Sequence, residues 1–480
     1  MKKLTTIAAL AASCFSAQAQ TLNVYAGGVK YTYPAAAVGD IGLSVGEVAI
    51  LGRRFPVSGI DSITVGSEPA KENTVSVSYL GDKAAVEADG RIAEHLDISV
   101  AGAHVSVTAR PTLASVVTYS LAGATSDGSF YMDGEYDSVL QLNGLNVNNP
   151  DSGAVTIDNG KLISLQIEGA NHLSDAKGGL QKACLFVNGH VHLSGGGTLS
   201  ITGNSKHAYF SDEYTHMIGG TLTVNAAVSD GMHINQYFRM DGGKISVNAA
   251  GDGIDVGLTG KNKEMEGRFI MNGGEIVATA KGDGAKAVKS DADMEISGGS
   301  LTAKAVGNAY YDALAADITS PAAMKCDGAF SMTNGSVSLL CTGLGGKALN
   351  VKGSVAVGGG DLSAVTTGGR YKYDSSLDAK THAVKADNTI TLSGGRVLAA
   401  VTDEKATSLK TDYHVNVDGS TLMCIGGKQT APTTGKQAYK AYGGVGVAAG
   451  AVVGRNGVSF KVPVEYSVGN AFLLVSSPTM

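Results

Sequence analysis

The chain has 480 residues, of which 66 are glycine and none is tryptophan. It carries 37 lysine and arginine residues against 43 acidic ones, and this negative net charge argues against nucleic acid as a partner. So much glycine without a collagen triplet is typical of tight corners between short strands. Beyond the first 19 residues no segment is apolar for long enough to span a bilayer, so we predict no transmembrane segment.

Residues 1–19 have the pattern of a secretory signal peptide. Lys2 and Lys3 precede an apolar stretch over 4–12, and Ala17-Gln18-Ala19 supplies the small-residue cleavage site. We therefore expect export to the periplasm, the cell surface or the extracellular space, with a mature chain that begins at Gln20.

Residues 20–110 lack any repeat and alternate in the manner of strands at 74–79 and 104–108. We predict a small N-terminal β domain or cap here, with a boundary at Arg110-Pro111. The tail over 426–480 shows new strand patterns and is predicted to form a C-terminal β cap, because the open end of a stack of strands needs a cover.

Between these ends, over 111–425, a glycine, a polar residue and an aliphatic residue recur with a period of about 24 residues. The residues after each glycine alternate with the strand period of two. The glycines stand at 197, 220, 243, 274, 299, 335, 360 and 395, with Ser420 in the ninth place. The pattern predicts an all-β fold, a parallel β-helix in which each repeat forms one coil of strands.

A second column of residues lies twelve positions before the glycine in most coils. It is small throughout, and we expect it to face solvent as a ledge: Ala208, Gly231, Gly253, Ala287, Ala323, Ala348, Ala383 and Ser408. Two positions later we expect another outward column: Phe210, His233, Asp255, Lys289, Lys325, Asn350, Lys385 and Lys410. A ledge beside stacked lysines would suit an extended anionic chain, so the candidate carbohydrate ligands are Lys289, Lys325, Lys385 and Lys410.

The same lysines have an alternative, structural role. Each is followed two residues later by an aspartate, as in Lys289-Ser290-Asp291 and Lys385-Ala386-Asp387. An aspartate beside each lysine would neutralise the row, since stacked like charges repel one another without a partner. The sequence leaves both roles open.

Three coils are lengthened, at 258–266, 309–321 and 370–381, and the latter two insertions fall just before the small-residue column. Insertions that cluster at one corner of a solenoid form loops on one side, which is often the binding side. Exposed tyrosine on such a loop can stack on a sugar ring, and the candidates are Tyr311, Tyr371 and Tyr373.

Aspartates gather in the middle coils, at Asp230, Asp252, Asp255 and Asp283. Oxygen ligands that converge from adjacent coils are what Ca²⁺ requires, so these four are a candidate calcium site. Because Asp-Gly is also a preferred tight-turn dipeptide, a turn-forming role is the alternative. The histidines, among them His233, show no metal-ligand spacing along the chain and are interpreted as strand-surface residues.

The cysteines give no sign of a metal or redox motif. Cys14 follows a poor lipoprotein acceptor sequence, so we expect no lipid anchor there. The other four are widely separated and contain no Cys-x-x-Cys pair: Cys184, Cys326, Cys341 and Cys424. We interpret them as small buried hydrophobic residues.

Stacked phrases such as Gly251-Asp252-Gly253-Ile254-Asp255 and His382-Ala383-Val384-Lys385-Ala386-Asp387 resemble the carbohydrate-binding parallel β-helix family of secreted bacterial proteins. The resemblance covers roughly residues 115–425. It implies a pectate-lyase-like, right-handed solenoid that binds an acidic, uronate-rich polysaccharide such as polygalacturonate, with calcium held by the coils. The segment 59–65 resembles N-terminal segments of exported proteins from gut-type Gram-negative anaerobes.

We therefore predict a secreted, non-catalytic protein that holds an extended acidic polysaccharide along one face. The first alternative is a polysaccharide lyase or glycosidase, with Asp252 and Asp255 holding calcium and Lys289 as the base. Against it, the chain lacks the Trp-Ile-Asp-His and Arg-x-Pro-x-x-Arg phrases of pectate lyases and the Gly-His-Gly phrase of pectin hydrolases. The second alternative is a structural surface fibre or adhesin.

Overall fold

The computed structural model describes residues 20–39, 41–260, 265–428 and 431–480. In this part of the chain, strands and turns are joined by two short 3₁₀ helices, η1 (Val57–Gly59) and η2 (Ala93–His95). No helix among the described residues is long and apolar enough to cross a membrane. The predicted signal segment 1–19 lies outside the described residues. The chain is divided into two compact units, of which the first ends at Ile201 and the second begins at Thr202.

The first unit begins with antiparallel strands. β1 (Thr21–Ala26) pairs antiparallel with both β2 (Val29–Pro34) and β6 (Ile60–Gly66). A separate three-stranded sheet contains β3 (Gly42–Ser44), β4 (Glu47–Ile50) and β5 (Arg53–Pro56). Tyr33 and Val24 are fully buried, so this part has a hydrophobic core of its own.

Parallel stacking starts within the first unit, before the predicted boundary at Arg110-Pro111. β7 (Thr74–Leu80) pairs in parallel with β11 (Val117–Thr125), and β10 (Ala103–Ala109) pairs in parallel with β12 (Gly128–Asp133). The remaining strands of the unit are β8 (Ala84–Asp89), β9 (Leu96–Ala101), β13 (Ser138–Asn149), β14 (Val155–Glu168), β15 (Ala170–Asp175), β16 (Ala183–Gly195) and β17 (Thr198–Gly203), which contains the unit boundary. The predicted N-terminal region thus supplies strands to the first coils.

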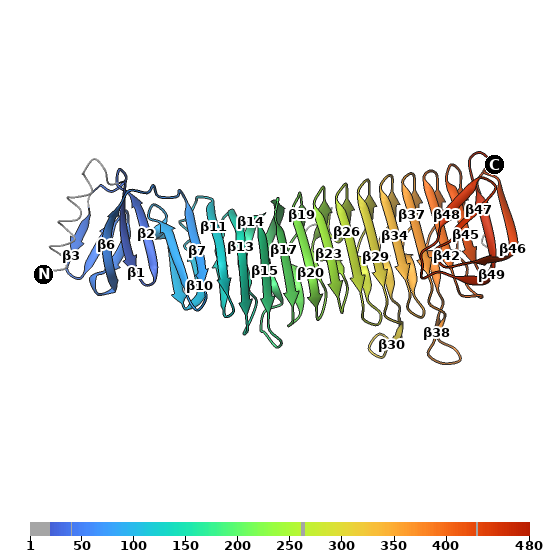
Figure 1. The fold of residues 1–480 in the computed structure, drawn as a ribbon, viewed down its shortest axis with the longest axis horizontal. Helices are drawn as coiled ribbons and strands as arrows, with labels where there is room; N and C mark the ends of the chain where they lie inside the picture. The colour runs from blue at the N-terminus through green and yellow to red at the C-terminus, as the bar shows by residue number, and fades with distance from the viewer. Residues whose placement is uncertain (1–19, 40, 261–264, 429–430) are drawn as a thin grey trace. The chain divides into compact units, whose positions relative to one another are not determined.

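The second unit is a parallel β-helix whose coils contribute three strands each (Figure 1). Its first sheet contains β18 (His207–Ser211), β21 (Met232–Asn235), β24 (Ile254–Gly257), β27 (Lys286–Ser290), β32 (Ala322–Cys326), β35 (Lys347–Val351), β40 (His382–Ala386) and β43 (Leu409–Lys410). The second contains β19 (Thr215–Met217), β22 (Tyr237–Met240), β25 (Arg268–Met271), β28 (Met294–Ile296), β33 (Phe330–Met332), β36 (Val355–Val357), β41 (Ile390–Leu392) and β44 (Val415–Val417). The third contains β20 (Thr221–Ala227), β23 (Lys244–Ala249), β26 (Glu275–Ala280), β29 (Ser300–Ala305), β34 (Ser336–Cys341), β37 (Asp361–Thr366), β42 (Arg396–Val401) and β45 (Thr421–Gly426).

The glycine of each repeat stands directly before a strand of the third sheet. Gly243 and Gly274 have φ of +83° and +80°, a region that other residues rarely adopt. A Cβ atom on Gly274 would lie 2.8 Å from the carbonyl oxygen of Gly243, one coil away. Both the backbone conformation and the closeness of the coils therefore require glycine here, and the predicted all-β parallel β-helix is confirmed.

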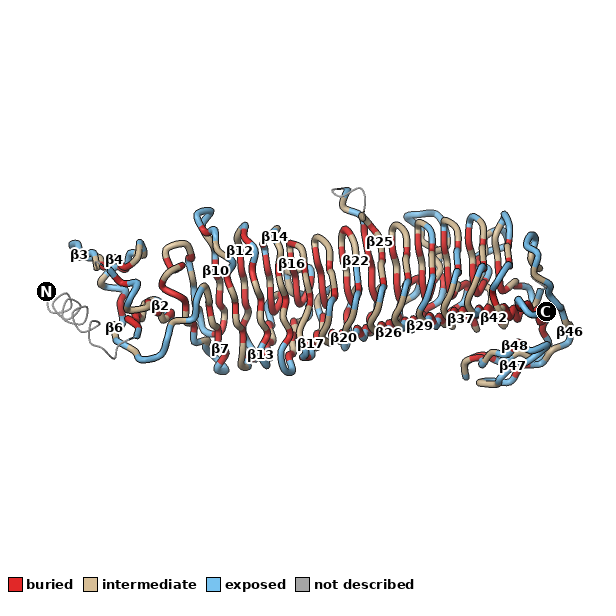
Figure 2. The backbone as a smooth tube through the Cα atoms, turned by 90° about the horizontal axis from the view of Figure 1, so that it is seen from above, coloured by how far each residue is buried: buried red, intermediate tan, exposed pale blue. Residues whose placement is uncertain are grey.

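Buried and less buried residues alternate along much of each coil (Figure 2). The alternation fails at the small-residue column, where Ala287 and the next residue, Val288, are both fully buried. Ala208, Ala323, Ala348, Ala383 and Ser408 are equally buried. The predicted solvent-facing ledge is therefore wrong: these residues face the interior at the start of the first-sheet strands, and at Gly253 an added Cβ would lie 2.3 Å from the carbonyl oxygen of Ala287.

Two of the predicted insertions form hairpins at the same corner of the coil. Residues 309–321 contain β30 (Tyr310–Asp312) and β31 (Asp317–Thr319), and residues 370–381 contain β38 (Tyr371–Lys372) and β39 (Asp378–Ala379). Both hairpins lie between a strand of the third sheet and the next strand of the first, and both project from the same edge in Figure 1. The insertion at 258–266, of which 261–264 lie outside the described residues, follows β24 and is at a different corner.

The C-terminal segment covers the last coil of the second unit. β49 (Val468–Ser476) pairs antiparallel with β45 and with β46 (Tyr439–Val447), while β47 (Val452–Arg455) and β48 (Val458–Lys461) form a hairpin. Tyr466 is fully buried in a cluster with Val458 and Leu473, and its hydroxyl donates to the carbonyl of Val401 (3.0 Å). This segment satisfies the exposed edge of β45, as a cap does.

Candidate functional site

The first sheet of the second unit stacks the predicted outward side chains in one column. Strand register aligns His233 with Asp255, Asp255 with Lys289, and Lys289 with Lys325. It continues from Lys325 through Asn350 and Lys385 to Lys410. We call these seven residues the charged column. Its order agrees with the sequence prediction, but the small residues beside it are buried.

The lysines of the charged column in the middle coils are neutralised by aspartates. Nζ of Lys289 lies 2.8 Å from Asp255 Oδ1 and 3.2 Å from Asp291 Oδ1. Burial lowers the pKa of Lys289, but the two carboxylates outweigh it and hold the pKa well above its usual value. Lys325 lies 2.7 Å from Asp327, which also pairs with Lys352. The alternative structural role therefore describes these lysines well.

The two lysines nearest the C-terminus are also paired, but they are more accessible. Lys385 lies 2.5 Å from Asp387, and Lys410 pairs with Asp412. Their side chains are 34% and 40% exposed, against 21% for Lys289. Ion pairs at this level of exposure are weak and can open to a competing anion at small cost.

The aspartates of the middle coils accept hydrogen bonds from the backbone of the next coil. The N–H of Asp252 donates to Oδ1 of Asp230 (2.9 Å), and the N–H of Lys286 donates to Oδ1 of Asp252 (2.7 Å). The N–H of Asn308 donates to Oδ1 of Asp283 in the same way (2.8 Å). Burial raises the pKa of Asp252 to about 6. Each of these contacts engages one carboxylate oxygen, as the turn-forming alternative predicts.

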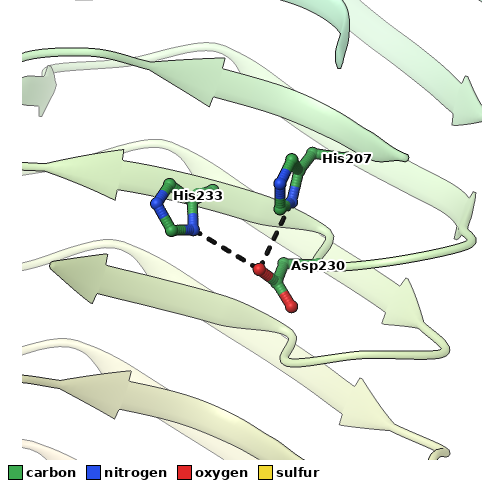
Figure 3. A group of neighbouring side chains, drawn as sticks. All are labelled: His207, Asp230 and His233. Carbon is green, nitrogen blue, oxygen red and sulfur yellow. Dashed lines mark hydrogen bonds and ion pairs between the residues drawn. The ribbon is translucent and has the colours of Figure 1, made fainter. Parts of the chain in front are cut away.

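A different group converges around Asp230. His207, Asp230 and His233 are the three residues, among those that the structure describes, whose candidate ligand atoms all lie within 4.8 Å of one another (Figure 3). Nδ1 of His207 and Nδ1 of His233 lie 3.3 and 3.4 Å from Oδ2 of Asp230. His207 was not among the predicted site residues, because no ligand spacing along the chain marks it. The available signal was that positions 207 and 230 are one repeat apart.

A cavity of about 340 Å³ lies where the two hairpins meet the C-terminal end of the charged column. We call it the hairpin groove. It is lined by Asp317, Ile318, Ser320, Lys347, Asp378, Ala379, Lys380, His382, Lys385 and Lys410. Two residues of the predicted set, Lys385 and Lys410, therefore share one cavity, whereas Lys289 and Lys325 do not line it.

Two lysines of the groove, Lys347 and Lys380, form no ion pair with a carboxylate among the described residues, although Asp317 and Asp378 also line it. Nζ of Lys347 donates to Ser320 Oγ (2.8 Å) and to the carbonyl of Gly345 (3.0 Å). Burial, assisted by the charge of Lys385, lowers the pKa of Lys347 to about 8. Neither lysine was predicted from the sequence, because neither belongs to the charged column. Only the stacking of the coils brings them close to that column.

His382 forms the wall of the same groove. It is 8% exposed, and burial lowers its pKa to about 4, so the ring is neutral near neutral pH. Nδ1 of the ring lies 3.0 Å from the carbonyl oxygen of Thr407. Since a carbonyl can only accept, Nδ1 carries the proton, and Nε2 is left with a lone pair.

The predicted tyrosines separate into stacking and anchoring residues. Tyr311 and Tyr373, one from each hairpin, stack with their ring centroids 4.0 Å apart and 13° between the ring planes. Tyr373 is 50% exposed, so this pair presents an aromatic surface to solvent. Tyr371 is half-buried, and its Cβ lies close to Gly345 in the body of the coil. It positions the hairpin instead.

Fold and groove together define the class: a parallel β-helix protein with a lysine-lined groove and a tyrosine pair on the two hairpins that line part of that groove. Residues 101–374 match the family model described as carbohydrate-binding domain-containing protein. Because this match spans more than half of the 480 residues, the chain belongs to that family.

The chain is similar to a solved structure titled as the polysaccharide lyase-like protein from C. thermocellum, in a gadolinium derivative. The identity is 20%, the TM-score is 0.37, and the match covers 58% of this chain and 96% of that one. No curated protein matches the chain.

Proposed function

We propose that this protein binds an extended, acidic polysaccharide in the hairpin groove without cleaving it. The observation that carries the proposal is the pair of lysines without carboxylate partners, Lys347 and Lys380, in a groove that also contains Lys385 and Lys410. A cavity with an excess of cationic groups favours carboxylate-bearing ligands. Membership of the carbohydrate-binding domain-containing family supports a polysaccharide as the source of those carboxylates.

The tyrosine pair supplies the second kind of contact. A sugar ring has apolar C–H faces, and the exposed ring of Tyr373 can pack against such a face while Tyr311 supports it from behind. The groove continues along the first sheet, where Lys385 and Lys410 occupy adjacent strands. Because adjacent strands are ~4.8 Å apart, an extended chain lying across them would meet a cation at each coil.

The decisive experiment compares two sets of lysine variants on polygalacturonate. Lys347→Met and Lys380→Ala together should weaken binding at least about tenfold, because each removes a cation without a carboxylate partner. Lys325→Ala is the matched control, since Lys352 still pairs with Asp327 in its absence. We expect it to change the dissociation constant less than about twofold. Unchanged binding by the double variant, or an equal loss in the control, would contradict the groove as the site.

The lyase mechanism considered from the sequence is not supported by the side chains assigned to it. Lys289 is held as a cation between two carboxylates, and it therefore has no lone pair to accept a proton near neutral pH. Asp255, assigned to calcium, is paired with His233 and Lys289. These contacts support the binding proposal over catalysis by that set of residues.

One observation nevertheless favours a lyase as the second candidate function. Neutral His382 has a free electron pair on Nε2 in a groove whose lysines could hold a uronate carboxylate, and a general base of this kind can remove the proton at C5. Incubation with polygalacturonate, followed by the ultraviolet absorbance of unsaturated product, tests it. Product that His382→Gln abolishes would establish the lyase, and no product would leave binding as the function.

Calcium dependence and export belong to the proposal as well. Binding measured with calcium and then with chelator tests whether calcium at Asp230, Asp252, Asp255 and Asp283 contributes. Loss of binding with chelator would support it, whereas calcium-independent binding would place recognition at the lysines alone. Location in the periplasm, at the cell surface or outside the cell follows from the signal-like sequence over 1–19 and is tested by fractionation of the native cells.

A further inference from the structure

The group of His207, Asp230 and His233 connects two neighbouring coils. His207 begins β18, while Asp230 and His233 flank the start of β21 in the next coil (Figure 3). Their side chains are only 17%, 16% and 23% exposed, so the group is largely removed from solvent. Phe210 stacks on the ring of His233, with centroids 4.9 Å apart and 10° between the planes, and covers it from one side.

The distances in this group are long for hydrogen bonds to a carboxylate. Charge-assisted N–H···O bonds are normally ~2.7–2.9 Å long. Here Oδ2 of Asp230 lies 3.3 Å from Nδ1 of His207 and 3.4 Å from Nδ1 of His233. Two ligand atoms bound tetrahedrally at ~2.0–2.1 Å from one zinc ion are about 3.4 Å apart, and both of these distances match that separation.

The surroundings of Asp230 and His207 also prepare them as ligands. The N–H of Asp252 holds Oδ1 of Asp230, which leaves Oδ2 directed at the two histidines. Such an outer hydrogen bond to a carboxylate is the usual way in which a protein orients a metal ligand. Nδ1 of His207 is buried, and its contact within the described residues is the 3.3 Å ion pair with Asp230 and not a well-formed hydrogen bond, so this nitrogen can serve as a metal ligand.

The nature of the donors selects the ion. Two imidazole nitrogens and one carboxylate oxygen suit zinc and similar divalent transition metals, whereas calcium requires six to eight oxygen ligands. Asp255 is the nearest further carboxylate, with Oδ2 3.2 Å from Nδ1 of His233, but its Oδ1 is engaged by Lys289 at 2.8 Å.

We propose that His207, Asp230 and His233 form a binding site for a divalent transition metal ion of the zinc type, which connects two adjacent coils of the β-helix. Three protein ligands leave a fourth position for water or for an oxygen atom of a bound ligand. The site lies in coils that do not contribute to the hairpin groove, so it is independent of the function proposed for that groove.

The test measures metal bound by the full chain after removal of metal and dialysis against zinc in the presence of excess calcium. We expect one zinc ion per chain in the wild-type protein, determined by elemental analysis. His207→Asn and His233→Asn should each weaken zinc binding at least about tenfold, because an amide nitrogen does not replace imidazole as a ligand. His216→Asn is the matched control: His216 also pairs with an aspartate, with Nε2 2.7 Å from Asp241 Oδ2, but within the described residues it belongs to no group of three candidate ligand atoms.

A second readout keeps the proposal testable if a variant fails to fold. Cobalt added to the metal-free wild-type protein should give the intense visible absorption of a four-coordinate ion, and one equivalent of zinc should remove it. Failure of the wild-type protein to bind zinc, equal zinc binding by all variants, or the weak spectrum of six-coordinate cobalt would each overturn the proposal and leave a hydrogen-bonded cluster in its place. Circular dichroism confirms the fold of each variant.

Discussion

Residues of one type have different roles along the first sheet, according to what lies beside them. Lys289 lies between two carboxylates and acts as part of the coil structure. Lys347 instead has only neutral acceptors, the hydroxyl of Ser320 and the carbonyl of Gly345. A partly buried cation without an ion-pair partner raises the free energy of the folded protein, and a bound carboxylate would relieve that cost. This is why we assign Lys347 to ligand binding and Lys289 to stability.

The lowered pKa of Lys347 leads us to expect that the affinity for polygalacturonate depends on pH. In the free protein, burial and the charge of Lys385 lower the pKa of Lys347 to about 8. Lys286 also lowers this pKa, whereas Cys341 and Asp317 raise it. An anionic ligand prefers the protonated lysine, so affinity is full below pH 8 and is lost as the pH rises above it. We expect the affinity for polygalacturonate to fall about tenfold between pH 7 and pH 9.5.

Isothermal titration calorimetry across this range measures the effect, with Lys347→Met as the control. The variant has no group that titrates near pH 8 at this position, so its affinity should be lower but nearly constant over the same interval. The same slope in the wild-type protein and in Lys347→Met would show that another group is responsible.

At the scale of single elements, the two hairpins depend on glycines in the coil beneath them. Gly284, at φ +70°, lies against Tyr310 of the first hairpin, and a Cβ placed on it would come within 2.6 Å of that ring. Gly345, at φ +69°, lies against Ala309, Tyr371 and Ala379. The hairpins that form the groove can approach the coil this closely only because no side chain stands between them.

Gly345→Ala should therefore displace the second hairpin. Its new Cβ would lie 2.9 Å from three other Cβ atoms, and its left-handed φ costs a further ~1 kcal/mol. We expect a lower free energy of unfolding, by ~2–4 kcal/mol in total, and at least about a tenfold weaker binding of polygalacturonate.

The control is Gly457→Ala in the turn between β47 and β48. That glycine has φ +75° but nothing within 4 Å of an added Cβ, so only the ~1 kcal/mol of backbone strain applies. Denaturant titration and the binding assay are made on both variants. Equal effects of the two substitutions would mean that the hairpin does not rest on Gly345 as described.

At the scale of the whole molecule, the chain contains two compact units, and the second ends in a cap. A parallel β-helix leaves an open strand edge at its last coil, and such an edge can pair with another chain. β49 covers the edge of β45, and Tyr466 fixes the covering segment to Val401. The cap is therefore expected to keep the second unit from associating with itself.

Removal of residues 427–480 should expose β45 and produce species that are larger than the full-length protein and grow with concentration. Size-exclusion chromatography with light scattering measures the mass at several concentrations, beside Tyr466→Phe, which keeps the cap and loses only one hydroxyl contact. A truncated protein whose mass does not grow with concentration would contradict this role of the cap.

The sequence by itself determined the fold of the second unit and the order of the charged column. Three features are local in the sequence: the glycine before each third-sheet strand, the strand period after it, and the positions of the two tyrosine-bearing insertions. The repeat of about 24 residues then predicts how these features stack from coil to coil. The buried, unpaired cysteines were also predicted correctly, because an isolated cysteine without a motif is usually a small hydrophobic residue.

Only the tertiary structure decided which of these residues act together. It showed that the small-residue column faces inward, that the predicted lysines have aspartate partners, and that Lys347 and Lys380 line the groove. It also brought His207 to Asp230 across one full repeat. Spacing along a chain shows which residues share a column, but burial and ion pairing depend on neighbours from other coils and from inserted hairpins, and these meet only after the coils have stacked.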